Sequence, residues 1–443
     1  MLQRLGFPDI GPHRRFVTAL AIDALGSGIW MPLSMLYFLH QTSLSLVELG
    51  LAMTIANTAA IAVVPFLGSL VDRVGPKIVM QAGNAGAAVA FLMYPFAHSL
   101  VVVTVLIFCA TTTRQAFWSA LGPMVTQITR PGERELWFGF LQAMRNAGYG
   151  VGGVVSAVAL TIGSGVAFQS VVVANAASYL LAFGLMLAVA GGGRPMGADA
   201  SATGSARSGW WVAFADRGYR TLIAVVFCYA MAAMTLNVAM PVYFIELLGL
   251  PGWIPGTVIE LLGLPGWIPG TVFVINTVMI GVGQGLVVRA MTGRTRRRVM
   301  HVAVAFTAAS YVMFYAAGDL SATTGIVLVL VAAFVYTLGE MTAGPVVSAL
   351  ANETPPADRR GRYLAATQLA WSAAAALSPL LYTALLDRGS LATWGGPILI
   401  CAVWAILIEV LRHRMPQVTR PVTNVAEPDP GPVDSTAEAP STS

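Results

Sequence analysis

Residues 68–80 read GSLVDRVGPKIVM and form a short polar loop between two long apolar segments. Gly68 removes side-chain bulk where two helices must come close, and Gly75 permits a tight backbone turn. Asp72 stands at the boundary of an apolar segment, where its carboxylate can accept hydrogen bonds from the N-terminus of a helix or pair with an arginine. The loop therefore has the composition of a polar contact between packed helices, and the segments on either side decide what kind of protein contains it.

The chain around this loop is too apolar for a water-soluble protein. Of its 443 residues, 56% are hydrophobic and 10% are charged, whereas soluble domains carry about 25% charged residues. The apolar residues occur in runs near the length that a helix needs to cross about 30 Å of hydrocarbon. The N-terminal segment lacks a small-residue cleavage site, so we expect the first apolar run to stay in the membrane. The sequence predicts an all-α membrane protein.

Twelve segments qualify as transmembrane helices. Their predicted bounds are 16–38, 46–67, 78–97, 99–127, 136–162, 167–190, 220–245, 270–290, 299–318, 322–350, 363–386 and 392–411. Almost all of the 25 basic residues fall at the two termini or in the loops that follow even-numbered spans. The exceptions are Arg388, in an opposite loop, and Arg114 and Arg145, inside spans. Because basic residues stay on the cytoplasmic side, both termini are predicted to be cytoplasmic.

The predicted domains follow from these spans. A cytoplasmic N-terminus (1–15) precedes a six-helix bundle (16–190), a cytoplasmic linker (191–219), a second six-helix bundle (220–412) and a cytoplasmic tail (413–443). Gly, Ser and Ala dominate the linker, as in flexible connections. The tail is rich in proline and acidic residues, and we expect it to be disordered.

The two predicted bundles resemble each other in sequence. Span four ends GPMVTQITRPGER and span ten ends GPVVSALANETPPADRR, and Pro123 and Pro345 are separated by the same distance, within a few residues, as Gln142 and Gln368. A nearly constant offset indicates an internal duplication with the halves in parallel orientation, which is a transporter design. The alternative is that both halves use common loop sequences.

The loop 68–80 is similar to the signature loop of the major facilitator superfamily. The matching residues are Gly68, Asp72, Arg73, Gly75 and Lys77, and Pro76 stands where that family usually has a base. The resemblance implies two pseudo-symmetric six-helix bundles that transport a solute by alternating access. It also implies that this loop latches the halves together on the cytoplasmic side when the transporter faces outward. A simpler role for the two basic residues is to supply positive-inside charge.

Four ionisable residues fall near the middle of predicted spans: Asp23, Arg114, Arg145 and Glu340. Insertion scales assign about 2.5–3.5 kcal/mol to Asp or Arg at a helix centre, so such groups must pair or line a wet cavity. They could form purely structural salt bridges. The functional interpretation is that one acid carries a coupled proton, with Arg114 or Arg145 as its partner. Asp23 is the first candidate, because span one lines the central cavity in the superfamily, and Glu340 is the second.

Large apolar side chains near these charges are candidates for the cavity wall, with ordinary packing as the alternative. They are Trp30, Met31, Trp118, Met144 and Trp371. Span five, RNAGYGVGGVVSAV, resembles the glycine-rich antiporter motif of drug-exporting members but lacks its proline. Close helix packing is the alternative reason for these glycines. The phrases GEMTAGP and RGRYLA also resemble bacterial multidrug exporters.

Residues 245–258, IELLGLPGWIPGTV, are repeated without change at 259–272. Two prolines and three glycines in each copy disfavour a continuous helix. One copy already supplies a loop of ordinary length, and lengthening a loop costs at most about 1 kcal/mol. We therefore interpret the second copy as a tolerated duplication, with an external lid as the alternative.

Together these features predict a proton-coupled transporter in a bacterial cell membrane, exporting small amphipathic compounds or drugs. Lys77 is the only lysine among many arginines, a bias typical of a GC-rich bacterial genome. The alternatives are an importer of a small metabolite, an enzyme embedded in the membrane and a non-transporting receptor. The five histidines and three cysteines show no catalytic or metal-ligand spacing. We expect a monomer that needs a lipid bilayer, a small-molecule substrate and a proton gradient, and that takes no metal, cofactor or nucleic acid.

Overall fold

The computed structural model describes residues 8–130, 132–162, 164–191, 211–235, 267–386 and 388–423. Within these ranges the regular elements are helical. The N-terminal half contains α1 (Arg14–Trp30), α2 (Ser34–Gln41), α3 (Leu46–Val74), α4 (Pro76–Met93), α5 (Leu100–Ile128), α6 (Arg134–Ile162) and α7 (Gly165–Leu187). The C-terminal half contains α8 (Val212–Ala215), α9 (Arg217–Met234), α12 (Trp267–Met291), α13 (Arg296–Ala317), α14 (Ala322–Glu353), α15 (Arg360–Leu386) and α16 (Ser390–Arg414).

The prediction of an all-α membrane protein is confirmed. Nine helices of the described part are long and apolar enough to cross a bilayer. The first predicted span is formed by α1 and α2, which the 3-10 turn Met31–Leu33 joins. Pro32 lies in that turn, where a proline removes a backbone donor and interrupts the α-helix.

Local signals in the sequence set several helix starts. Ser45 caps α3, with Glu48 completing a capping box. Ser99 and Ser164 cap α5 and α7 by accepting from backbone N–H groups. Gly75 joins α3 to α4 with a φ of 89°, a left-handed conformation that favours glycine.

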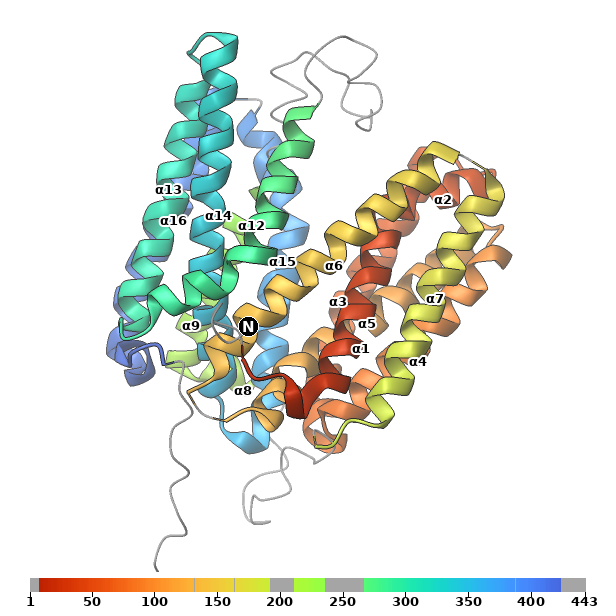
Figure 1. Cartoon of the computed structure of the whole chain (residues 1–443), viewed down its shortest axis with the longest axis horizontal. Helices are drawn as coiled ribbons and strands as arrows, with labels where there is room; N and C mark the ends of the chain where they lie inside the picture. The colour runs from red at the N-terminus through yellow and green to blue at the C-terminus, as the bar shows by residue number, and fades with distance from the viewer. Residues whose placement is uncertain are drawn as a thin grey trace, which may run out of the picture.

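The helices form two bundles that touch at one end and diverge at the other (Figure 1). Contacts between the bundles run from α6 to α12 and α14, and from α3 to α15. We call the touching end the basic end, because it holds the α3–α4 and α5–α6 loops, the start of α13 and the arginines near them. Pro123 and Pro345, the residues that suggested a duplication, lie inside the equivalent helices α5 and α14.

The predicted tail differs from the structure at its beginning. Met415, Val418 and Val422 are buried in the core of the C-terminal bundle. Gly293 donates a backbone hydrogen bond to Val422, and Val422 donates one to Arg294. The expectation of disorder over 413–443 is therefore wrong for 413–423, because apolar residues of this segment pack into the core of the C-terminal bundle. Residues 424–443 lie outside the described part.

Two other predicted segments fall largely outside the described residues. In the linker 191–219, α8 and the start of α9 are helical, so the second bundle begins before residue 220. In the tandem repeat, residues 245–266 are outside the described part, and the end of the second copy begins α12 at Trp267. Pro269 is tolerated there because the N–H groups of a first helical turn have no partner within the helix.

Candidate functional site

Asp23 and Arg145 form a buried ion pair between α1 and α6. Nη1 of Arg145 lies 3.0 Å from Oδ2 of Asp23, and both residues are nearly inaccessible to solvent. Nη2 of Arg145 also donates to the hydroxyl of Tyr149, one turn further along α6. The guanidinium lies 4.3 Å from the ring centroid of Trp118, a cation–π distance. Each charge is thus compensated inside the membrane-spanning region, as burial requires.

The ion pair stands in the wall of a cavity of about 310 Å³ inside the N-terminal bundle. Helices α1, α3, α4, α5, α6 and α7 all contribute to it. Of the predicted lining residues, Trp30, Met31 and Trp118 are in its wall. Six further aromatic side chains, which the sequence analysis missed, also line it: Phe38, Phe91, Tyr94, Phe117, Tyr149 and Tyr179. Its volume suits a small organic molecule.

Arg114 of α5 lines the same cavity but is placed differently from Arg145. Its side chain is exposed. Within the described part of the chain, no hydrogen bond or ion pair engages its guanidinium, although its charge acts on nearby Asp23. The cavity wall therefore carries one compensated pair and one additional cation.

Glu340 is not part of this cavity. It lies on α14 in the other bundle, where the amide of Asn276 on α12 donates to its Oε2 at 2.8 Å. The predicted set of four mid-span charges is thus divided: three meet at the N-terminal cavity, and the fourth has a neutral partner elsewhere.

Two predicted lining residues are not in the cavity wall. Met144 packs against the core formed by α1, α3, α4, α5, α6 and α7. Trp371 of α15 packs in the C-terminal bundle, edge-on to Tyr229 at 5.5 Å between ring centroids. Both side chains are partly buried against these cores, and neither lines the N-terminal cavity.

The loop 68–80 contacts the other bundle at the basic end through its acid. The Asp72 carboxylate accepts from the backbone N–H groups of Gly361 at 2.6 Å and Arg362 at 3.1 Å, at the start of α15. Nε of Arg362 is a further 3.6 Å contact. A carboxylate at a helix N-terminus is favoured both by the orphan donors and by the helix dipole.

The other members of this loop have separate positions. A Cβ on Gly68 would lie 2.6 Å from the carbonyl oxygen of Gly361, so glycine permits α3 and α15 to touch. Lys77 donates to the carbonyls of Leu187 and Val189, and thereby caps the C-terminus of α7 in its own bundle. Arg73 is exposed. Asp72 and Gly68 are thus the members of the matching set whose contacts with the other bundle are described.

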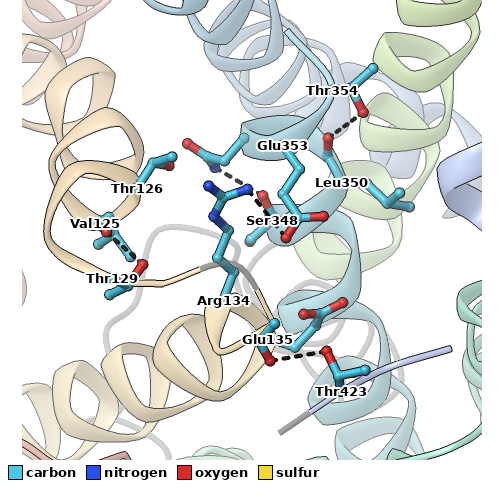
Figure 2. Close-up of polar contacts among 12 residues, drawn as sticks. Val125, Thr126, Thr129, Arg134, Glu135, Ser348, Leu350, Glu353, Thr354 and Thr423 are labelled. Atoms are coloured by element: carbon cyan, nitrogen blue, oxygen red, sulfur yellow. Dashed lines mark hydrogen bonds and ion pairs between the residues drawn. The ribbon is translucent and has the colours of Figure 1, made fainter. Parts of the chain in front are cut away.

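A buried charge network at the basic end was not found from the sequence. Arg296 of α13 lies 2.5 Å from Oε1 of Glu135 on α6 and 2.8 Å from Oε2 of Glu353 on α14. Arg134 adds a 3.4 Å contact to Glu353. Figure 2 shows Arg134 extending from α6 toward Glu353 across the junction of the bundles, with Thr423 nearby. The arginines of these loops serve in the sequence analysis only to predict topology. The signal that could have predicted the network is the presence of acidic residues, Glu135 and Glu353, in the same loops and helix ends.

A second polar contact between the bundles lies nearer the middle of the helices. Nε2 of Gln368 on α15 donates to Oε1 of Gln115 on α5 at 2.9 Å, and Gln115 donates to the hydroxyl of Ser372. Gln115 directly follows Arg114 in the chain. The charged cavity and the junction of the bundles are therefore connected through consecutive residues of one helix.

We predict that Asp72→Asn weakens closure of the basic end. The substitution keeps the side-chain shape but removes a charge that accepts two hydrogen bonds, and such bonds contribute about 1.5–3 kcal/mol. The reporter is Thr126→Cys, a buried position on α5 near the basic end, in a chain with its native cysteines replaced. Its alkylation by a polar thiol reagent should become about tenfold faster or more.

The matched control for this prediction is Arg73→Gln, which changes a neighbouring exposed charge. Equal alkylation rates in the two variants would show that Asp72 does not hold the bundles together.

The described residues contain no group of three or more His, Cys, Asp or Glu side chains placed to hold a metal ion. Cys109, Cys228 and Cys401 are all free thiols. Asp23, the acid of the cavity, is already bound to Arg145. The cavity thus presents an aromatic wall with a cationic group rather than a set of metal ligands.

The sequence model of the Major Facilitator Superfamily matches residues 16–282 and residues 254–434 of the chain. No curated protein matches its sequence. The structure is similar to that of a bacterial homologue of the iron transporter ferroportin in an outward-facing state, with a TM-score of 0.70 and 12% identity, covering 91% of this chain and 99% of that one.

The same is true of a structure of a bacterial ferroportin homologue in the outward-facing state with soaked iron. Here the TM-score is 0.67 and the identity 12%, covering 90% of this chain and 98% of the other. At such low identity the likeness concerns the fold.

Proposed function

This chain belongs to the major facilitator superfamily of transporters, and we propose that it exports small amphipathic compounds in exchange for protons, by alternating access. The observation that carries the proposal is the Asp23–Arg145 pair in the wall of an aromatic cavity. The Asp23 carboxylate accepts a proton most easily when Arg145 moves away, because its charge then loses its partner. A change in the spacing of α1 and α6 would therefore couple proton uptake to the state of the cavity.

In this proposal the basic end faces the cytoplasm, as the distribution of arginines favours. The conformation described is then closed toward the cytoplasm by Asp72 and the Arg296 network, and its bundles diverge on the outer side. Opening requires these contacts to break and equivalent contacts to form at the other end. Glu340, held by Asn276, is the second candidate for the proton site.

Import of a small metabolite by the same fold is the alternative direction. The structural neighbours are homologues of an iron transporter, which suggests iron as a third substrate class. The geometry of this chain favours an organic molecule instead, because Arg145 occupies the carboxylate that a cation would need, and eight aromatic side chains are among the residues of the wall.

The test is transport into proteoliposomes with and without an imposed pH gradient. The probes share one ring system and differ in charge: 2-naphthoate, 2-naphthamide and 2-naphthylmethylammonium. For the full-length protein we expect at least one probe to accumulate against its gradient, and a protonophore to abolish this. Asp23→Asn should exchange the probe without accumulating it, because the proton-accepting group is gone.

Glu340→Gln is the companion variant, since it removes the second candidate and preserves the side-chain shape. If both variants accumulate the probe as the unaltered protein does, neither acid couples protons and the proposal is wrong. The direction of transport follows from cells with and without the gene: lower accumulation of the probe in the expressing cells supports export, and higher accumulation supports import.

A further inference from the structure

We infer that the cavity of the N-terminal bundle selects amphipathic organic anions, and that Arg114 binds the anionic group. This inference rests on the proposed transport function and specifies its substrate class. It follows from three features of the cavity: its charge balance, the position of its polar donors and its aromatic wall.

The charge balance leaves one positive charge facing the cavity. Asp23 and Arg145 are 3.0 Å apart and neutralise each other. Arg114 is exposed in the same wall, and among the described residues no ion pair or hydrogen bond engages its guanidinium. A guanidinium near the middle of a membrane-spanning helix is costly unless it is paired or hydrated. A bound anion would supply the missing partner, and its displacement of water would strengthen the attraction.

A second donor faces the same space. Thr111, one helical turn before Arg114 on α5, donates to Oδ1 of Asn57 on α3 at 3.0 Å. This bond engages the carbonyl oxygen of the Asn57 amide and leaves its N–H groups as donors. Asn57 and Thr111 are both exposed or partly exposed and both line the cavity. A planar carboxylate can accept from the forked guanidinium and from such an amide together.

The remaining wall suits the apolar part of the ligand. Trp30 contacts Phe91 edge-on at 5.0 Å between ring centroids, and Tyr94 lies 4.7 Å from Phe91. All three line the cavity. Such a cluster of rings accommodates another flat ring by stacking or edge contacts. The expected ligand is therefore a compact ring system that carries one carboxylate.

A cationic ligand fits this cavity poorly. The acid in its wall, Asp23, is already paired with Arg145, and Arg114 would repel a second cation. Glu340, the acid of the other bundle, does not line the cavity. Selection by charge, rather than by shape alone, follows from this arrangement.

The experiment measures equilibrium binding to the purified full-length protein in nanodiscs, without any gradient, by calorimetry. The probes are again 2-naphthoate, 2-naphthamide and 2-naphthylmethylammonium. We expect the carboxylate to bind at least tenfold more tightly than the amide, and the ammonium most weakly. Arg114→Gln should weaken carboxylate binding by about tenfold or more and leave amide binding unchanged, because a charge-assisted contact is lost.

Two further variants make the outcome specific. Arg114→Lys keeps the charge without the forked geometry, so it should retain part of the preference for the carboxylate. Arg388→Gln removes an exposed arginine outside the cavity and should bind all three probes as the unaltered protein does. Because no hydrogen bond or ion pair among the described residues engages the Arg114 guanidinium, we expect Arg114→Gln to unfold at the unaltered temperature, which separates lost binding from lost structure.

Equal affinity for the carboxylate and the amide, or unchanged carboxylate binding in Arg114→Gln, would overturn the inference. Neither result depends on proton coupling, since no gradient is present. Conversely, proton coupling that survives both Asp23→Asn and Glu340→Gln would defeat the proposed function and leave the anion preference standing. The two proposals therefore fail by different measurements.

Discussion

Replacing Arg296 with alanine is expected to open the basic end of the protein and to abolish the coupled transport proposed above. Arg296 is the common partner of Glu135 and Glu353, and Glu135 is completely buried. Removing one member of a buried ion pair costs about 3–5 kcal/mol, because the remaining charge is left without compensation. Separation of α6 from α13 lowers this free-energy cost, because it admits water to the Glu135 carboxylate. The arrangement in which the basic end is closed would then no longer be lower in free energy than the arrangement in which it is open.

The measurement is alkylation of Thr126→Cys from the basic end, as for Asp72. A loss of this size corresponds to a rate increase of about a hundredfold or more. The matched control is Arg298→Ala, which removes an exposed arginine from the same turn of α13. If the two alanine variants are alkylated equally fast, the network does not close this end.

A double variant distinguishes the ion pair from the shape of its side chains. Glu135→Leu combined with Arg296→Met removes both charges and keeps apolar volume at the junction. Since well-packed apolar groups can replace a buried pair at little cost, we expect the double variant to be alkylated more slowly than Arg296→Ala. A rate as fast as that of the single variant would contradict the assignment of the effect to the unpaired Glu135.

The second large effect is expected at Gly152, where α6 passes α1. A Cβ on Gly152 would lie 2.5 Å from the carbonyl oxygen of Leu25 and 2.6 Å from the carbonyl carbon of Gly28. These are backbone atoms, so no side chain can rotate away. Gly152→Ala must force α1 and α6 apart, and overpacking of this kind costs about 1–3 kcal/mol or more. Because these helices carry Asp23 and Arg145, the variant should also lose the proposed proton coupling.

The adjacent glycine provides the control. A Cβ on Gly153 would meet nothing within 4 Å. Gly153→Ala should therefore leave the unfolding temperature unchanged or raise it slightly, since alanine exceeds glycine in helix propensity by up to about 1 kcal/mol. Thermal unfolding of both variants in the same detergent makes the comparison. Similar unfolding temperatures would show that the contact between α1 and α6 tolerates a methyl group.

The glycine-rich segment of span five illustrates how far a sequence motif can be interpreted. Its resemblance to an antiporter motif implies one common role for all of its glycines. In the structure they divide: Gly148 and Gly152 face α1, and Gly150 faces Thr277 of the other bundle. Close packing accounts for most of them, as the alternative interpretation held. The rotation of α6 about its axis decides which glycine meets which neighbour, and a glycine-rich stretch carries no marker of that rotation.

The charged residues also show that a sequence can indicate which residues are unusual without indicating which of them meet. The cost of placing ions in hydrocarbon marked Asp23, Arg114, Arg145 and Glu340 as unusual without any structure. The pairing of Asp23 with Arg145 was among the possibilities, but nothing in the chain distinguished it from pairing with Arg114. The Arg296 network escaped notice altogether, because its members lie at helix ends, where charges are ordinary.

The amino-acid sequence by itself indicated the membrane-spanning helices, the division into halves and the residues that needed a partner. Each of these depends on the transfer of a short segment between water and hydrocarbon, a free energy that sums over neighbouring residues. The tertiary structure alone decided which charges meet, which aromatic rings enclose the cavity and that Arg114 is left facing it. Those outcomes depend on the packing of helices far apart in the chain, where one glycine can set the distance between two backbones.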